Sequence, residues 1–356
     1  MKCFLVFVLL FSFLTPQTGF AVTAELLEVY EERGDLQVAF NSENFQAIPG
    51  SAAGFLIDLE DWAHQYGWQA YPELASYAPA VSPAEHVGSW VMPDVAGRYI
   101  MIDNASGAII AASHADEVWP IASITKLVSA KIAIDYGLDL GGRGTVEAED
   151  DVGGAKLWAD YGTRFTVRDL LYATLVGSAN NAANAIARLT GYEKEDFVSH
   201  MNAFARSHNL SRTMFADPTG IEEANISTAR EVAEFTREIF EHENIRRPSG
   251  TWSTHIEALD DPDYVRDIRS TNWLLYDSAY DDVYVTAGKT GYLGEDVGWN
   301  LVVRMHPMGR SEDESVLIVL LGSDGRRESF DDAASLARWA WQNFDWNRIS
   351  YSTASQ

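Results

Sequence analysis

A serine and a lysine stand three residues apart in the stretch WPIASITKLVSAK, residues 119–131. Positions i and i+3 lie on one face of a helix, so the amine of Lys126 can reach the hydroxyl of Ser123. A serine hydroxyl next to a base is an arrangement for nucleophilic catalysis, in which the serine oxygen attacks a carbonyl and forms an acyl-enzyme. The spacing therefore predicts acyl-transfer chemistry, provided that the lysine can act as a base.

An ordinary lysine is a poor base, because its pKa of ~10.4 keeps it protonated at neutral pH. Lowering that pKa to ~7 or 8 requires about 3 to 4 kcal/mol of differential interaction, supplied by desolvation or by a second cation. The backbone amide of Ser123, at a helix N-terminus, can also face a developing oxyanion. We therefore expect one helical turn to supply the nucleophile, the base and an oxyanion donor.

Two further stretches carry residues of the same chemistry. The first, VGSANNAANAIA, offers Ser178 and Asn180 between two predicted helices, and the second, AGKTGYLGE, offers Lys289, Thr290 and Gly291 on a predicted edge-like strand. Taken singly, the asparagine could cap a helix, the lysine could protect a sheet edge and the glycine could mark a bulge. The chain has only six lysines, however, and two of them fall within these three motifs. The set in this order favours catalysis.

Regular elements that could position these residues begin at about residue 96. Two apolar runs in GRYIMIDNASGAIIAAS flank a turn at residues 104–107 and predict a β-hairpin. Helical spacing begins after Pro120 and recurs in four stretches, the last with Thr228 and Glu231 at capping-box spacing: FTVRDLLYATLVG, NNAANAIARLT, EKEDFVSHMNAFARSH and STAREVAEFTREIFEH. Three strands and a closing helix follow: VYVTAGKTGYL, GWNLVVRMH, ESVLIVLLGS and SFDDAASLARWAWQNF. Strands at both ends with helices between them predict an α/β (α+β) fold with an antiparallel sheet.

The N-terminus is typical of a secretory signal peptide. A short positive region, an apolar core over residues 3–14 and small residues at 21–24 predict cleavage after Ala24, hence a periplasmic or secreted protein. The only cysteine, Cys3, would leave with this leader, so no disulfide is expected. The remaining chain has no run of about 18 apolar residues, and we expect no membrane-spanning segment.

Composition and prolines define the rest of the organisation. Acidic residues number 52 against 26 basic ones, and the net charge of −26 argues against nucleic-acid or anionic-membrane partners. After the predicted signal peptide, 1–24, we expect an extension and linker of unknown role, 25–92, a main domain, 93–346, and a polar tail, 347–356. The extension either packs its aromatic residues on the main domain or forms a partner-binding module.

The three motifs resemble those of penicillin-binding proteins and class A β-lactamases. Stretches such as PIASITKLVSAKIA, FTVRDLLYATLVGSANNAANAIA, MFADPTGIEEANISTAREVAEF and KTGYLGEDVGWNLVV are similar to the low-molecular-weight D-alanyl-D-alanine carboxypeptidases and endopeptidases, over residues 96–345. The resemblance implies a β-lactamase/transpeptidase-like fold: a five-stranded antiparallel sheet flanked by helices, with an inserted all-helical subdomain. Glu231 departs from the pattern, which often has Asp there, and residues 25–92 match nothing familiar.

The resemblance also implies catalytic roles. Ser123 would attack the carbonyl between two D-alanines of a peptidoglycan stem peptide while Lys126 takes its proton. Ser178 would relay a proton toward the leaving amine, and Asn180 would hold both Lys126 and the substrate amide. Water would then hydrolyse the acyl-enzyme, and β-lactam antibiotics would act as covalent inhibitors.

Substrate recognition is implied for the third motif. Lys289 and Thr290 would bind the substrate carboxylate, and Gly291 would let the strand approach. The backbone amides of Ser123 and Tyr292 would form the oxyanion hole, each worth ~3 kcal/mol. No metal and no cofactor is expected, since the eight histidines are scattered without an H-E-x-x-H motif.

Other activities remain open at this point. A class A-like serine β-lactamase would share the three motifs, but the stretch DPTGIEEAN lacks the Glu-x-x-Leu-Asn spacing expected of that class. A noncatalytic cell-wall scaffold is the other alternative. The closing helix ends near Phe344 and only about a dozen residues without a basic amphipathic pattern follow it, so no membrane anchor is expected. This favours endopeptidase action on crosslinks alongside carboxypeptidase action.

Overall fold

The computed structural model describes residues 6–13, 21–32, 35–41, 83–95 and 97–346, and the chain divides into two compact units, 1–78 and 79–356. In the first unit three strands form an antiparallel sheet in chain order: β1 (Val6–Phe13), β2 (Ala21–Glu32) and β3 (Asp35–Asn41). The predicted polar tail lies outside the described residues, as do parts of the predicted signal peptide and extension. These three segments stay predictions.

The second unit is built on a five-stranded antiparallel sheet. Its strands follow the order β13 (Val283–Tyr292), β14 (Trp299–Pro307), β15 (Val316–Ser323), β5 (Arg98–Asp103) and β6 (Ile109–Ser113). The register places Tyr99 opposite Leu320, so the first strands of the unit pair with its last. The predicted hairpin, the three predicted late strands and the closure of the sheet by both ends of the domain are confirmed.

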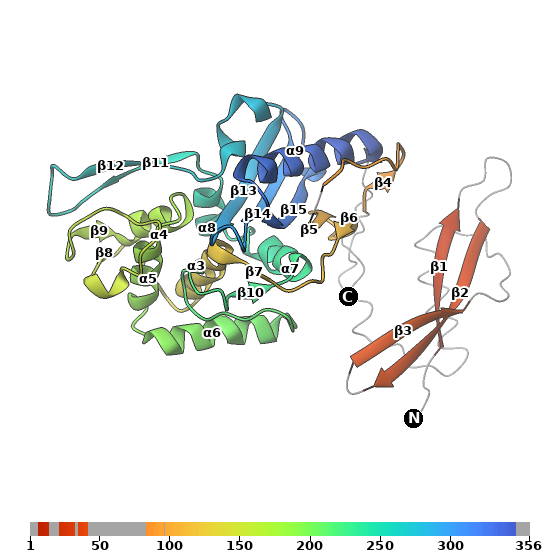
Figure 1. Ribbon diagram of the computed structural model, residues 1–356, viewed down its shortest axis with the longest axis horizontal. Helices are drawn as coiled ribbons and strands as arrows, with labels where there is room; N and C mark the ends of the chain where they lie inside the picture. The colour runs from red at the N-terminus through yellow and green to blue at the C-terminus, as the bar shows by residue number, and fades with distance from the viewer. Residues whose placement is uncertain (1–5, 14–20, 33–34, 42–82, 96, 347–356) are drawn as a thin grey trace, which may run out of the picture. The chain divides into compact units, whose positions relative to one another are not determined.

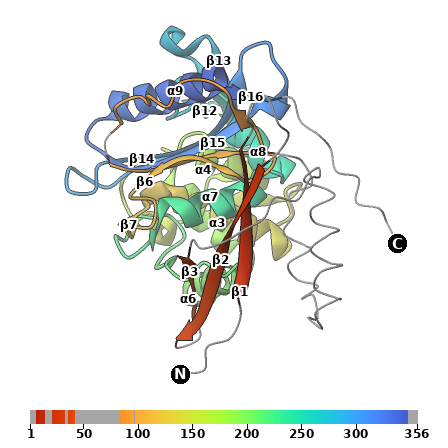
Figure 2. The same cartoon turned by 90° about the vertical axis from the view of Figure 1, so that its right-hand side faces the viewer.

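Alternation along the strands gives the sheet two apolar faces. Ile100 and Ile102 belong to a core shared with the helices of the middle of the chain, whereas Tyr99 and Met101 belong to a core shared with α9 (Arg326–Asn343). Because side chains alternate with a period of two, each strand serves both cores. Figure 2 shows α9 on one side of the sheet and α3, α7 and α8 on the other.

The helices of the insertion lie between β6 and β13 in the chain (Figure 1). They are α3 (Thr125–Asp135), α4 (Val167–Leu175), α5 (Asn180–Arg188), α6 (Lys194–Ser207), α7 (Ala229–Ile239) and α8 (Glu243–Ser249). Every predicted helix of this region is therefore present. Within the described part of the chain, no helix is long and apolar enough to span a membrane.

Short antiparallel ladders supplement these elements. They pair β8 (Arg143–Thr145) with β9 (Arg164–Thr166), β11 (Ser253–Glu257) with β12 (Val265–Arg269), β7 (Trp119–Pro120) with β10 (Ile226–Ser227), and β4 (Glu85–His86) with β16 (Phe344–Asp345). Three of them, β7–β10, β8–β9 and β11–β12, lie between β6 and β13 in the chain, as the helices of the insertion do. These strands are two to five residues long, too short for an alternation pattern in the sequence to reveal them.

The start of α7 shows half of the predicted capping box. The hydroxyl of Thr228 accepts a hydrogen bond from the amide of Glu231 at 3.1 Å, as expected. The carboxylate of Glu231 instead accepts hydrogen bonds from the amide of Arg212 and the hydroxyl of Thr213. Glu231 therefore ties the start of α7 to the preceding loop rather than closing the box.

Candidate active site

Ser123 and Lys126 lie where the sequence places them, at the start of a helix. A single 3₁₀ turn, Ala122–Ile124, leads directly into α3, and the amine of Lys126 donates to Ser123 Oγ at 2.8 Å. Ala122 has a φ of +50°, a value that costs a non-glycine residue energy and is concentrated at functional sites. The backbone just before the serine is therefore held in a strained conformation by its surroundings.

Three oxygen atoms surround the amine of Lys126. Besides Ser123 Oγ, it donates to Asn180 Oδ1 at 2.7 Å and to the carbonyl of Thr219 at 2.6 Å. A neutral amine has two N–H groups and one lone pair, and the amide oxygen and the carbonyl can only accept. Once deprotonated, the amine can donate to these two oxygens and direct its lone pair at the hydroxyl of Ser123. The site thus orients the amine as a base toward that hydroxyl.

The surroundings of Lys126 also favour its neutral form. Complete burial holds the pKa of Lys126 well below its ordinary value, and the positive charge of Lys289 lowers it further, against the opposing charge of Asp217. These are the two causes that the sequence argument requires for a basic lysine, desolvation and a second cation.

Lys289 comes from the edge strand β13 and is 1% exposed. Its amine donates to Ser178 Oγ and to the carbonyl of Thr290, both at 2.8 Å, and burial lowers its pKa to about 7. Ser178, between α4 and α5, has a φ of +60°. The second and third predicted motifs are thus joined directly by a hydrogen bond.

Gly291 brings β13 against the backbone of the nucleophile. A Cβ at this glycine would lie 2.9 Å from the carbonyl oxygen of Ile121 and 3.2 Å from the amide nitrogen of Ser123, so a larger residue would push the strand away. Tyr292 follows on the same strand, with its ring stacked on Trp299 at 4.2 Å. The two backbone segments expected to form an oxyanion hole are therefore in contact.

A buried aspartate turn, which the sequence argument did not single out, supports the base. Asp217 accepts hydrogen bonds from the amide and hydroxyl of Thr219, the amides of Gly220 and Glu222, and the side chain of Asn225. Burial acts to raise the pKa of Asp217, but these hydrogen bonds outweigh burial and leave that pKa below its ordinary value. The turn carries the Thr219 carbonyl that faces Lys126. The Asp-Pro-Thr-Gly sequence was the available signal, since such residues favour turns.

Arg326, at the start of α9, is a second addition to the predicted set. Its guanidinium lies over the rings of Trp273 and Trp299 and donates to the carbonyl of Thr271 at 2.9 Å. The hydroxyl of Thr271 is 2.6 Å from that of Thr290. Arg326 therefore places a second cation beside the third motif. No sequence spacing could link it to that motif, because the contact depends on how α9 packs on the sheet.

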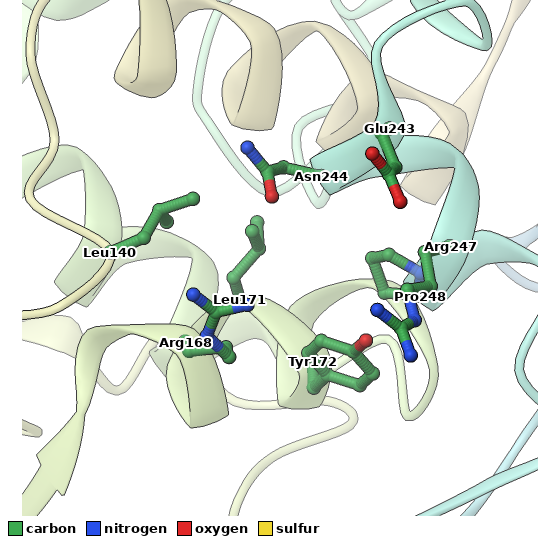
Figure 3. A pocket seen from close by; sticks show the side chains of 8 residues that line it. All are labelled: Leu140, Arg168, Leu171, Tyr172, Glu243, Asn244, Arg247 and Pro248. Carbon is green, nitrogen blue, oxygen red and sulfur yellow. The ribbon is translucent and has the colours of Figure 1, made fainter.

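A separate pocket of about 220 Å³ lies between α4 and α8, and Figure 3 shows the side chains around it. It is lined by Leu140, Arg168, Leu171, Tyr172, Glu243, Asn244, Arg247 and Pro248. Of these lining residues, none belongs to the predicted site. The candidate chemistry is therefore located where the three motifs meet, not in this pocket.

Comparison with known proteins identifies the family. The D-alanyl-D-alanine carboxypeptidase family matches residues 92–324. A D-alanyl-D-alanine endopeptidase of Pseudomonas aeruginosa is 30% identical over 268 residues, which cover 74% of this chain and 83% of the relative. A D-alanyl-D-alanine carboxypeptidase of Bacillus subtilis is 27% identical over 208 residues, covering 55% of this chain and 50% of the relative.

Solved structures show the same fold. The Streptomyces K15 DD-transpeptidase superposes with a TM-score of 0.62 and 23% identity, covering 71% of this chain and 99% of the other. The predicted fold, including its inserted helical part, is confirmed by this similarity and by the five-stranded sheet. The three motifs meet beside the edge strand β13. Because the family matches residues 92–324 and a D-alanyl-D-alanine endopeptidase is 30% identical, the chain belongs to the D-alanyl-D-alanine carboxypeptidase family.

Proposed function

We propose that this protein is a serine-type D-alanyl-D-alanine peptidase that acts on peptidoglycan stem peptides through an acyl-enzyme on Ser123. The observation that carries the proposal is the environment of Lys126, whose amine is 2.8 Å from Ser123 Oγ and is held by two further oxygen acceptors. A buried lysine with a lowered pKa in that geometry serves as a general base.

The reaction then proceeds in two balanced steps. Lys126 takes the proton of Ser123 as the serine oxygen bonds to the carbonyl carbon of the penultimate D-alanine. The carbon–nitrogen bond to the leaving amine breaks, and that amine receives the proton that Lys126 took up, relayed by Ser178, so that Lys126 is neutral again. Ser178 is hydrogen-bonded to Lys289. Water then bonds to the ester carbon while Lys126 takes one of its protons, the ester carbon–oxygen bond breaks to release the shortened peptide, and Lys126 returns the proton to the Ser123 oxygen.

Two cations and a threonine hydroxyl recognise the terminal carboxylate of the substrate. Lys289 and Thr290 lie on β13, and the guanidinium of Arg326 donates to the carbonyl of Thr271, whose hydroxyl contacts that of Thr290. Charge-assisted hydrogen bonds of this kind are about twice as strong as neutral ones.

Endopeptidase activity on D-alanyl crosslinks is favoured over carboxypeptidase activity alone. The matched segment spans 83% of the P. aeruginosa endopeptidase but 50% of the B. subtilis carboxypeptidase, so this chain corresponds more completely to the endopeptidase. Both reactions use the same acyl-enzyme and differ in the leaving amine, so we propose that this enzyme performs both.

The same assignment implies a site of action outside the cytoplasm. A peptidase of stem peptides works on the cell wall, and the predicted signal peptide, residues 1–24, supplies the export that this requires. We infer a periplasmic or secreted enzyme that β-lactams acylate on Ser123, because their strained amide takes the place of the D-alanyl bond.

The test uses the full chain with three substrates. Purified crosslinked muropeptide dimer and pentapeptide monomer are incubated separately, with product masses followed by mass spectrometry, and a fluorescent penicillin is added in parallel. Slow penicillin turnover with release of D-alanine and cleavage of the dimer supports the proposal. Rapid penicillin hydrolysis would instead show a β-lactamase. Absence of labelling would show a noncatalytic scaffold, and release of D-alanine with an intact dimer would show a simple carboxypeptidase.

A further inference from the structure

We propose that Asp151 is a positioning residue for catalysis, because it folds the loop of residues 151–161 so that the carbonyl of Gly153 fixes the orientation of the Asn180 side chain. The proposal rests on the proposed function, in which Lys126 is the base. Among the described residues, Asp151 makes no hydrogen bond to Lys126, Ser123 or Asn180, and it acts on Asn180 through the backbone of Gly153.

The orientation of Asn180 matters because its amide has two chemically different ends. Asn180 Nδ2 donates to the carbonyl of Gly153 at 2.7 Å, while its Oδ1 accepts from Lys126. A backbone carbonyl can only accept, so the Gly153 contact selects the rotamer that presents oxygen to the amine. In the opposite rotamer the amide N–H₂ would face Lys126 and compete with Ser123 for the lone pair.

The loop reaches Asn180 closely enough to impose this choice. Gly154 has a φ of +69°, and a Cβ there would lie 2.7 Å from Asn180 Nδ2. The backbone amide of Asn180 also donates a hydrogen bond to the carbonyl of Ala155 at 2.7 Å. Asn181 exchanges two further hydrogen bonds with the backbone of Leu157, at 2.8 and 2.9 Å. The loop is thus bound to the start of α5 along its length.

Asp151 supplies the fold of the loop itself. Its Oδ1 accepts from the amide of Gly153 at 3.0 Å, which closes a turn at φ +82°. Its Oδ2 accepts from the amine of Lys156 at 2.7 Å and from the hydroxyl of Tyr161 at 3.0 Å. One carboxylate therefore gathers donors from the beginning, middle and end of the loop, and the carbonyl of Gly153 follows directly on the amide that it holds.

A matched control is available in the same loop. Asp160 is exposed, and its side chain makes no hydrogen bond within the described part of the chain, so Asp160→Ala removes an equal charge without touching the Asp151 contacts. Tyr161 is 55% exposed and Lys156 is partly exposed, so the double variant Lys156→Met/Tyr161→Phe removes two of the three donors to Asp151 from the protein surface.

The measurement is the second-order rate constant of acylation by a fluorescent penicillin between pH 5 and pH 9, with unfolding temperature recorded for each variant. Asp151→Ala is expected to lose about tenfold to a hundredfold in rate, since small misplacements of catalytic groups cost that much. The two charged groups that act on the pKa of Lys126, which are Lys289 and Asp217, are unchanged in this variant. Losing the Asn180 oxygen removes an acceptor that favours the ammonium form, so the acid limb should move to lower pH.

Each outcome decides the question. The double variant should show the same direction of change, which keeps the test valid if Asp151→Ala does not fold, and Asp160→Ala should match the wild type in rate and acid limb. A reduced unfolding temperature with an unmoved acid limb and an unchanged rate would show a purely structural loop and overturn the inference. Absence of acylation in the wild type would refute the proposed function instead.

Discussion

Two buried lysines with different tasks define the site at the scale of single residues. In the proposed mechanism, Lys126 must be neutral to take a proton from Ser123, whereas Lys289 must be charged to bind a carboxylate. Both pKa values lie below that of an ordinary lysine, because both amines are buried, and that of Lys289 is about 7. Activity is therefore expected between the pKa of Lys126, which sets the acid limit, and that of Lys289, which sets the alkaline limit.

The pH dependence should reveal both groups. With a substrate that bears a terminal carboxylate, kcat/KM should rise with pH as Lys126 loses its proton, and fall again near pH 7 as Lys289 loses its own. In Lys289→Arg the guanidinium stays charged, so the alkaline limb should disappear from the steady-state profile. A wild-type alkaline limb that persists unchanged in this variant would rule out Lys289 as its source.

Removing the second cation should have two separable effects. In Lys289→Ala the charge that lowers the pKa of Lys126 is gone, so the acid limb should move to higher pH. Loss of a charged hydrogen bond, worth about 1.5–3 kcal/mol, should weaken carboxylate substrates by about tenfold to a hundredfold, and matching esters far less. Equal losses in kcat/KM for both substrates would show that Lys289 is structural.

At the scale of elements, glycines let two segments pack closely against the turn that carries the nucleophile. Gly220, with a φ of +79°, sits against the turn that carries Ser123, and a Cβ there would lie 1.9 Å from the carbonyl oxygen of Ala122. Gly291, on β13, also lies close to this turn, with its added Cβ 2.9 Å from the carbonyl oxygen of Ile121. The strained φ of Ala122 is therefore imposed by close backbone packing around it.

A pair of glycine variants separates backbone strain from this contact. Gly137 has a φ of +89°, and a Cβ added there would meet nothing within 4 Å, so Gly137→Ala should lose about 1–3 kcal/mol of unfolding free energy and keep its acylation rate. Gly220→Ala should lose more stability and also most of its acylation rate, because it displaces Ser123. Chemical denaturation and penicillin labelling measure the two quantities, and equal behaviour of both variants would contradict the argument.

The sequence predicted those helices and strands whose apolar residues recur at a regular spacing. The strands β13, β14 and β15, the helices α3 to α7 and the hairpin β5–β6 all have regular apolar spacing, and the structure confirms them. The ladders β8–β9 and β11–β12 were missed, since a pairing of three to five residues leaves no clear period. The sequence also predicted that both ends of the domain close the sheet, but it did not predict the order of the strands.

The candidate site was predictable only where side chains carry it. Some side chains have types and a spacing that indicate catalysis, and the structure brings them together: Ser123, Lys126, Asn180 and Lys289. The carbonyls of Thr219 and Gly153 could not be predicted, because every residue has a carbonyl and only the tertiary fold selects one. The same holds for Arg326, which reaches the third motif across the packing of α9.

The net charge of the whole molecule should influence its encounter with an anionic substrate. The net charge of −26 repels stem peptides, which carry carboxylates, while Lys289, the residue that we propose binds such a carboxylate, is buried. Raising the ionic strength from about 0.01 to about 0.15 M shortens the screening length from about 30 to about 8 Å. We therefore expect kcat/KM for an anionic stem peptide to increase with salt, and that for a neutral ester to stay constant. A decrease with salt for the anionic peptide would contradict this picture.

Covalent labelling of the intact protein tests the central claim most directly. After incubation with a penicillin, mass spectrometry of the protein and of its proteolytic peptides should locate one acyl adduct on Ser123. Ser123→Ala should be folded and unlabelled, and Ser199→Ala, which changes an exposed serine on α6, should be labelled like the wild type. An adduct on any other residue, or continued labelling of folded Ser123→Ala, would contradict the account.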